Sequence, residues 1–334
     1  MNAPGFPVEV GIIVPQLQFA YDDLLHRARR IESHGLHSMW LYDHLYGPML
    51  PGTPAFEGWT LATALLAQTE RLRVGHLVLC NNFRHPALLA KMASTLDVIS
   101  GGRLEFGLGS GSVEQEHREA GLPWGSVAER SDRLAEALEI ITSMFASERT
   151  TFVGEHYAVH DLANLPAPVQ RPRPPIHVGG AGERRTLPIV ARYADVWNVP
   201  TYALGEFERK RRVLADHCAA IGRDPDEIRI AYEAVMVVAS TDAELAAVQS
   251  KAERRFAGPG WGLHEGGCVG TPNRVIDRMH ELVEQGVSLF TFFCHDRASD
   301  ATLALIGDEI NARDRKSTRL NSSHVSESRM PSSA

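Results

Sequence analysis

Cysteine is scarce in this sequence, and no short cysteine pair is present. The four cysteines lie far apart in the chain: Cys80, Cys218, Cys268 and Cys294. Because there is no Cys-x-x-Cys, we expect reduced thiols rather than disulfides or a zinc site. The 15 histidines include neither His-x-His nor His-Glu-x-x-His. A metal-dependent barrel hydrolase using His44, His76 and His177 therefore has no ligand motif to support it, and no metal site is predicted.

Long apolar runs and an excess of basic residues are also missing. No run approaches the roughly 18 apolar residues that a membrane span requires, and the N-terminal MNAPGFPVEV lacks a basic segment followed by an apolar one. The formal net charge of −7 disfavours a partner with a phosphate backbone. We therefore expect a cytoplasmic protein that binds a small molecule and neither membranes nor nucleic acid.

The chain is long enough to bury a large core, with 334 residues of which 44% are hydrophobic. Length and composition fit one α/β barrel as easily as two smaller domains. The clearest pattern lies in residues 73–111, which predict one β-α-β unit with parallel strands. Within it, residues 74–79 are mainly apolar and read as a buried strand, Pro86 begins the helix, and Gly101-Gly102 ends it.

Glycines follow the second strand of this unit, residues 104–108. A Rossmann turn needs glycine at its first, third and sixth positions, but Gly107 and Gly109 are followed by Ser112 in the sixth place. The dinucleotide-binding fingerprint therefore fails. The alternative is a barrel strand whose glycines, Gly111 included, allow a ring or another backbone to approach closely.

Strand and helix patterns alternate along almost the whole chain. The predicted strands are residues 8–14, 38–42, 74–79, 104–108, 176–178, 195–199, 228–239 and 288–293. Beyond the helix that begins at Pro86, the predicted helices are residues 21–34, 59–70, 127–145, a helix from 183, 206–221, 241–256, 272–285 and 299–312. The predicted loops are residues 46–58 and 261–270, with an irregular insertion at 150–175. Eight alternating units favour an α/β fold of the (β/α)8 TIM-barrel type, with insertions, over a doubly wound sheet.

In such a barrel the active site lies at the carboxyl ends of the strands. The residues predicted at those ends are small or polar: Pro15-Gln16, Asp43-His44, Cys80-Asn81, Ser110-Gly111, Gly179-Gly180 and Asn198. Position along each strand thus separates candidate functional residues from core residues.

Several long motifs, in the same order, resemble the bacterial-luciferase-like flavin oxidoreductase superfamily, and above all its coenzyme F420-dependent branch. They are DVISGGRLEFGLGSG, the preceding FRHPALLAKMAS, YDHL after the second strand, EQEHREAG after the fourth, and PPIHVGGAGERRTLPIVARYADVWN. The resemblance covers residues 8–312 and implies one luciferase-like barrel domain over residues 1–314. It also implies a homodimer.

The resemblance implies a place for the cofactor. In this superfamily a flavin or deazaflavin ring lies across the barrel mouth, backed by a strand bulge with a non-proline cis peptide, which the motif places at Leu77-Val78. The phosphate-bearing tail then lies at a helix start rich in glycine, with Arg184 and Arg185 nearby. The implied cofactor-binding residues are Asp43, Leu77, Val78, Cys80, Asn81, Gly109, Ser110, Gly111, Gly179, Gly180 and Gly182. An ordinary buried strand and a tight barrel turn are the alternatives.

His44 and Glu116 are the implied catalytic residues. The Asp-His pair of the F420 branch puts His44 near the carbon that gains or loses the hydride, where an imidazole handles a substrate proton or fixes the donor's geometry. Asp43 then orients the imidazole or contacts the deazaflavin. Glu114 and Glu116 match the acidic positions after the fourth strand. A structural histidine and solvated carboxylates at a helix start are the alternatives.

The predicted function is hydride transfer between coenzyme F420 and a small organic substrate at the barrel mouth. The alternatives are an FMN-dependent luciferase-like monooxygenase and a non-catalytic F420-binding protein. Ser112 stands where some deazaflavin dehydrogenases of this superfamily have a glutamate. This departure argues against a sugar-phosphate dehydrogenase.

Residues 315–334 differ abruptly in composition from the rest of the chain. They are rich in serine, arginine and asparagine, with almost no apolar spacing. This composition predicts disorder, and the segment resembles translated adapter or vector sequence, so it is left out of the fold prediction. We therefore expect the natural C-terminus to be missing.

Overall fold

The computed structural model describes residues 6–48, 50–256, 258 and 260–311. The predicted tail, residues 315–334, lies outside the described residues. The main strands are β1 (Glu9–Ile13), β2 (Ser38–Leu41), β3 (Arg73–His76) with its continuation β4 (Leu79–Cys80), β5 (Leu104–Gly109), β8 (Ile176–Gly179), β9 (Val196–Val199), β10 (Arg229–Val238) and β12 (Val287–Cys294).

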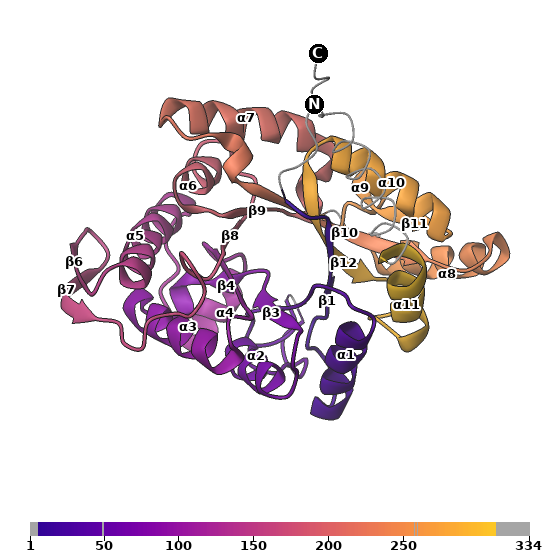
Figure 1. Cartoon of the computed structure of the whole chain (residues 1–334), viewed down its shortest axis with the longest axis horizontal. Helices are drawn as coiled ribbons and strands as arrows, with labels where there is room; N and C mark the ends of the chain where they lie inside the picture. Colours follow the sequence, from indigo (N-terminus) through magenta and orange to yellow (C-terminus); the bar gives the residue numbers. More distant parts are fainter. Residues whose placement is uncertain (1–5, 49, 257, 259, 312–334) are drawn as a thin grey trace, which may run out of the picture.

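These strands are parallel and close into a barrel, which Figure 1 shows from one end. The order β12-β1-β2-β3-β5-β8-β9 continues to β10, which pairs with both β9 and β12. Within the described residues the barrel thus has eight strands, with β4 extending β3 beyond an interruption. The prediction of a (β/α)8 barrel is confirmed.

Most helices surround the barrel and cover its outer face, but the helix Glu114–Ala120 lies inside this ring, beside β4 (Figure 1). The α-helices of the described residues are α1 (Tyr21–Ser33), α2 (Gly58–Ala67), α3 (Pro86–Ser100), α4 (Glu114–Ala120), α5 (Val127–Ala146), α6 (Thr186–Tyr193), α7 (Phe207–Ala220), α8 (Asp242–Arg255), α9 (Leu263–Gly266), α10 (Pro272–Glu284) and α11 (Asp300–Ala304), which a π-helical segment, Leu305–Asn311, extends. In the part of the chain that the structure describes, no helix combines the length and apolarity needed to cross a bilayer.

Three sequence predictions of local structure are wrong. Residues 150–175 were expected to be irregular, but β6 (Arg149–Val153) and β7 (Ala158–Ala163) form an antiparallel hairpin outside α5. Most of its side chains are exposed, so no apolar alternation marks it. Residues 261–270, expected to be an open loop, hold α9 and the short strand β11 (Cys268–Gly270), which pairs with β10. Helix α6 begins at Thr186 and not at 183, and the Gly182 carbonyl accepts the amides of its first residues, Thr186 and Leu187.

The barrel interior contains a large aromatic side chain at its centre. Trp40 of β2 is fully buried and belongs to an apolar cluster with Ile13 and Ala231. Two strand residues beside it are glycines, and a Cβ at Gly11 or Gly75 would lie 2.6 or 2.7 Å from the Trp40 ring. Glycine is therefore required at both positions to admit the indole.

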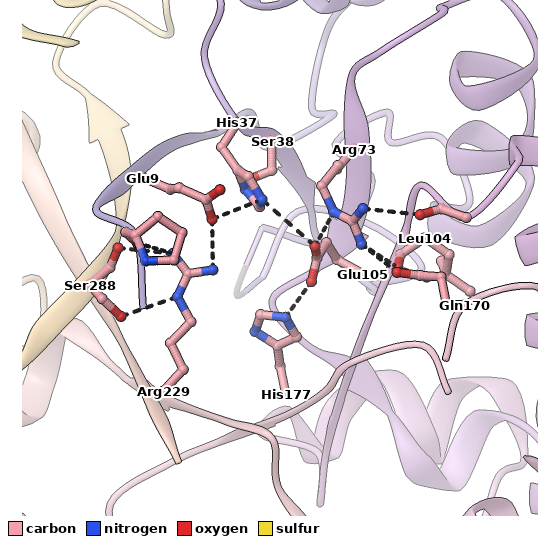
Figure 2. A network of polar contacts seen from close by, with 12 residues as sticks. Glu9, His37, Ser38, Arg73, Leu104, Glu105, Gln170, His177, Arg229 and Ser288 are labelled. Carbon is pink, nitrogen blue, oxygen red and sulfur yellow. Dashed lines mark hydrogen bonds and ion pairs between the residues drawn. The ribbon is translucent and has the colours of Figure 1, made fainter. Parts of the chain in front are cut away.

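A network of polar side chains lies at the amino ends of the strands (Figure 2). Its ionisable members are Glu9, His37, Arg73, Glu105, His177 and Arg229. The buried Glu105 carboxylate accepts hydrogen bonds from Arg73 and from Nε2 of His177, which is 2.6 Å away. Burial alone would raise the pKa of Glu105, but Arg73 and His177 outweigh it and hold that pKa well below its usual range.

Candidate functional site

A cavity of about 340 Å³ opens at the carboxyl ends of the barrel strands, the end opposite the polar network. Its wall includes most of the residues predicted from the sequence: Asp43, His44, Leu77, Val78, Cys80, Gly109, Ser110, Gly111, Glu116, Gly179 and Gly180. A cavity of this size is within the range of roughly 300–1,000 Å³ typical of small-molecule sites.

The third barrel strand is interrupted beside this cavity. The peptide bond Leu77-Val78 is cis, at the position the motif predicted. Strand β3 ends before this bond and β4 begins after it, so Leu77 and Val78 belong to neither strand. The Leu77 amide still donates to the Leu41 carbonyl of β2 at 3.0 Å, and both Leu77 and Val78 form part of the cavity wall.

Close packing explains two of the glycines in the wall. A Cβ at Gly109 would lie 2.6 Å from Cγ2 of Val78, and a Cβ at Gly179 would lie 2.9 Å from Cγ1 of the same residue. These glycines thus make room for the side chain that follows the cis bond. At Gly109 the glycine is therefore explained by close packing in a barrel strand, the alternative to a dinucleotide-binding turn.

His44 follows β2 and pairs with a carboxylate from another element. Its Nδ1 lies 2.8 Å from Oε1 of Glu116 on α4, and the Leu45 amide donates to Oε2 at 3.3 Å. Only 1% of Glu116 is exposed, whereas Glu114 one half-turn earlier is exposed. The solvated-carboxylate alternative therefore holds for Glu114 and is wrong for Glu116.

Asp43 is buried and already has two polar partners. Its carboxylate accepts two hydrogen bonds from Arg84, at 2.7 and 3.0 Å, and one from the Cys80 amide at 2.8 Å. Arg84 also pairs with Glu57, the residue that caps α2. Asp43 thus links the end of β2 to β4, the strand that follows the cis bond. Sequence reasoning missed Arg84, although it lies within the FRHP motif.

Cys80 presents a thiol to the cavity wall. Its Sγ lies 3.4 Å from Nε2 of His117, whose Nδ1 contacts the Val113 carbonyl at 2.9 Å. Burial raises the pKa of Cys80 to about 12. The thiol therefore stays protonated at neutral pH, which makes it a poor nucleophile.

The wall formed by β9 and β10 holds a third carboxyl group, which sequence reasoning missed. Glu233 lies in the middle of β10 and accepts a hydrogen bond of 2.9 Å from Nδ2 of Asn198 on β9. Burial raises the pKa of Glu233 to about 7, although the Asn198 contact lowers it. The signal was an acidic residue inside the apolar strand AYEAVMVV. It was overlooked because only strand ends were considered.

Two predicted cofactor residues are not part of the cavity wall. Asn81 is buried, and its Nδ2 donates to the Tyr157 hydroxyl at 3.2 Å. The Gly182 carbonyl caps α6. Arg185, expected beside the phosphate, pairs with Asp132 at 3.1 Å. The glycine-rich turn thus meets the cavity at Gly179 and Gly180, together with Thr186 at the start of α6.

The three histidines considered as metal ligands lie in different surroundings. His44 pairs with Glu116, His177 pairs with Glu105 in the polar network, and His76 stacks on Trp59 at 5.7 Å. They do not share one site.

The sequence profile of the family described as "Luciferase-like monooxygenase" matches residues 6–289. The chain belongs to this family. This assignment agrees with the resemblance inferred from the strand-end motifs.

Curated relatives share about a third of their residues with the chain over the matched part. An F420-dependent glucose-6-phosphate dehydrogenase of Microbacterium testaceum is 36% identical over 225 residues, which is 66% of this chain and 66% of the relative. An F420-dependent hydroxymycolic acid dehydrogenase of Mycobacterium tuberculosis is 28% identical over 69% of this chain and 62% of the relative. An FMNH2-dependent dimethylsulfone monooxygenase of Pseudomonas putida is 30% identical over 58% of this chain and 52% of the relative. The matches thus span less than two thirds of the relatives' own lengths.

Solved structures of other proteins share the fold. An F420-dependent secondary alcohol dehydrogenase superposes with a TM-score of 0.75 at 21% identity, over 92% of this chain and 99% of that one. The long-chain alkane monooxygenase LadA superposes with a TM-score of 0.76 at 15% identity, over 93% and 92% of the two chains. At such identities the likeness establishes the barrel and carries no information on the substrate.

Proposed function

We propose that this luciferase-like oxidoreductase uses coenzyme F420 and transfers a hydride between it and a small organic substrate at the carboxyl end of the barrel. The observation that supports this best is the pair of a partly exposed His44 and a buried Glu116, which line one cavity together with the cis peptide. The F420-dependent relatives support the choice of F420. The FMNH2-dependent relative makes FMN the competing cofactor.

The residues present fit a flat ring system with polar edges. Apolar side chains of the wall, Leu77, Val78 and Phe83, offer surface for the ring faces. The Leu77 amide is bound to the Leu41 carbonyl, which leaves the Leu77 carbonyl and the Val78 amide of the cis bond for the polar edge of a ring. The phosphate-bearing tail would lie along Gly179, Gly180 and Thr186. When bound, F420 supplies or accepts the hydride.

His44 provides the acid-base function. Because the Glu116 carboxylate accepts a hydrogen bond from Nδ1, that nitrogen carries the proton, and Nε2 of the neutral ring is an acceptor. Among the described residues Nε2 has no hydrogen-bond partner. It is therefore free to take the proton of a substrate hydroxyl, or to return it when the reaction runs in reverse. Glu116 is a positioning residue that fixes the tautomer and the orientation of the ring.

Asp43 and Arg84 hold the wall in place. The carboxylate of Asp43 is bound to Arg84 and to the Cys80 amide, so it fixes the segment just after the cis bond. A charge that is already paired and buried is a poor proton carrier. We therefore assign Asp43 a positioning role, and we assign the proton transfer with the substrate hydroxyl to His44.

Titration of the purified protein with F420 and with FMN tests the choice of cofactor. The visible spectrum of each cofactor reports binding, and addition of hydride donors or enone-type acceptors to the F420 complex reports turnover. We expect F420 to bind more tightly than FMN and to change its redox state with at least one partner. Tight FMN binding with negligible F420 affinity would overturn the proposal. F420 binding without any turnover would favour a non-catalytic binding protein.

A further inference from the structure

We propose that Asn198 and Glu233 form the substrate-recognition pair, and that the substrate is an uncharged compound with hydroxyl groups and without a phosphate or carboxylate. This inference rests on the proposed function, because it assigns a role to the cavity wall that faces His44. It names the class of substrate, which the proposed function leaves open.

The pair is built into the barrel wall. Asn198 of β9 lies opposite Ala231 of β10 in the parallel register, and its side chain reaches Glu233 two residues further along. On the same strand, Ala231 and Val235 belong to the interior cluster around Trp40, so the alternation of a strand points Glu233 inward as well. Both side chains are part of the cavity wall.

The pair has unused hydrogen-bond acceptors. Asn198 is 3% exposed, and its Oδ1 is buried without a hydrogen-bond partner among the described residues. Glu233 accepts one hydrogen bond, from Asn198, whereas a carboxylate has sites for about four. Buried polar atoms are rarely left without partners. A ligand that donates hydrogen bonds, as a hydroxyl does, would satisfy both groups.

The charge of the wall disfavours an anionic substrate. Three carboxyl side chains line the cavity, those of Asp43, Glu116 and Glu233. In the part of the wall that the structure describes there is no lysine or arginine. Arg84, the guanidinium behind the wall, is bound to Asp43 and Glu57. A phosphate or carboxylate in the cavity would meet the Glu116 carboxylate, and that of Glu233 above its raised pKa, without an unpaired lysine or arginine in the described part of the wall to compensate the charge.

The pair lies between the glycine-rich turn and the Tyr42 ring, because a Cβ at Gly179 would be 3.8 Å from Nδ2 of Asn198 and both Tyr42 and Glu233 line the cavity. The Tyr42 ring packs edge-on against His44, with centroids 5.7 Å apart. Tyr42 and Glu233 both line the cavity, and burial and then the charge of Glu233 raise the pKa of the Tyr42 hydroxyl. A small substrate lying over Tyr42 would thus reach Nε2 of His44 with its reacting hydroxyl and Glu233 with a second one.

Ligand-observed NMR with three probes of one carbon skeleton tests the proposal without need of turnover. The probes are cyclohexanol, trans-1,2-cyclohexanediol and cyclohexyl phosphate, each added to the protein with and without F420. We expect saturation transfer to the diol to be the strongest and transfer to the phosphate to be absent. A Glu233→Gln variant should lose at least about tenfold in diol affinity, which corresponds to about 1.4 kcal/mol, and should change the Kd of F420 less than twofold.

A matched control is Glu114→Gln, the same chemical change on an exposed residue of α4 outside the cavity. It should leave all three probes and F420 unaffected. Equal binding of cyclohexyl phosphate and the diol, or no binding of any probe, would overturn the proposal. So would a tenfold loss of F420 affinity in Glu233→Gln with unchanged probe binding, because the pair would then serve the cofactor. Failure of the wild type to bind F420 would refute the proposed function instead, and the probes without F420 would still decide the recognition pair.

Discussion

Nδ1 of His44 lies 2.8 Å from Oε1 of Glu116, and this contact joins the end of β2 to α4 across the mouth of the barrel. The carboxylate is buried, while the imidazole keeps a side-chain exposure of 19% on the cavity side. The pair therefore has one partner that water does not reach and one that a substrate can reach. In this arrangement the Glu116 carboxylate would orient the imidazole, and the His44 imidazole would exchange a proton with the substrate.

The first prediction concerns this pair. His44→Ala should lower the rate of the chemical step by roughly 10²-fold or more, the usual contribution of a positioned acid or base. The Kd of F420 should change little. Glu116→Gln should also lower the rate and should shift the pH dependence of kcat, because an amide no longer fixes the tautomer. Single-turnover rates and spectroscopic F420 titrations measure both effects, with Glu114→Gln as control. Wild-type rates in His44→Ala would remove His44 from the chemistry.

The second prediction concerns Gly109, the glycine that packs against the side chain of Val78. In Gly109→Ala the new methyl group would lie 2.6 Å from Val78, so the wall must shift. We expect a stability loss of about 1–3 kcal/mol, the usual cost of overpacking, and weaker binding of F420. The matched control is Gly205→Ala, whose Cβ would approach no atom closer than 3.5 Å. Denaturant unfolding and F420 titration separate the two effects. Equal behaviour of both variants would show that the wall tolerates the methyl group.

The third prediction concerns the polar network at the other end. Glu105→Gln should lower the unfolding free energy by about 3–5 kcal/mol at pH 7, because Arg73 loses its buried partner. The folded-state pKa of Glu105 is depressed, so its contribution is present above the unfolded value near 4.5 and is lost as pH falls. The difference between wild type and variant should therefore shrink below about pH 4.5. Urea unfolding at several pH values measures this difference in unfolding free energy. The control is Glu281→Gln, an exposed change that should lower the unfolding free energy by less than about 1 kcal/mol. A constant difference down to pH 3 would contradict this assignment.

The fourth prediction concerns Glu233 in the protein without cofactor. Its folded-state pKa is raised to about 7, so the folded protein holds a proton that the unfolded chain releases above about pH 4.5. Stability should thus fall as pH rises from 4.5 to 7, by up to about 3 kcal/mol, since one pKa unit is worth about 1.4 kcal/mol. Glu233→Gln should remove this slope while Glu114→Gln keeps it. Parallel pH curves for all three proteins would show that Glu233 ionises normally.

Local patterns and motifs in the sequence were enough to predict the barrel. Alternating apolar runs and helical spacing predicted the eight strands, because strands buried on both faces are nearly continuous apolar segments. Pro86 and Gly101 marked the ends of α3 correctly, with Gly101 in the left-handed conformation. The hairpin β6-β7 was missed because its exposed strands have no apolar face to signal them.

Only part of the candidate site was predicted, and its prediction depended on strand-end position and family motifs rather than on local apolar patterns. Strand-end position and family motifs identified His44, Glu116 and the bond Leu77-Val78, since these residues follow strands directly or match long motifs. Glu233 lies in mid-strand, and Arg84 reaches the site only through its pairing with Asp43. Such residues become visible when distant segments are brought together, because their roles depend on contacts of 35 or 41 positions in sequence separation.

The polar network of Figure 2 has a consequence for changing what this protein acts on. Its ion pairs connect strands at the amino ends, while the cavity is made by side chains at the carboxyl ends. Replacements at Asn198 or Glu233 therefore remove none of the charged groups that connect the strands at their amino ends. A library that varies only cavity residues keeps the ion pairs at the amino ends of the strands. Few of its inactive variants should therefore be inactive because they fail to fold.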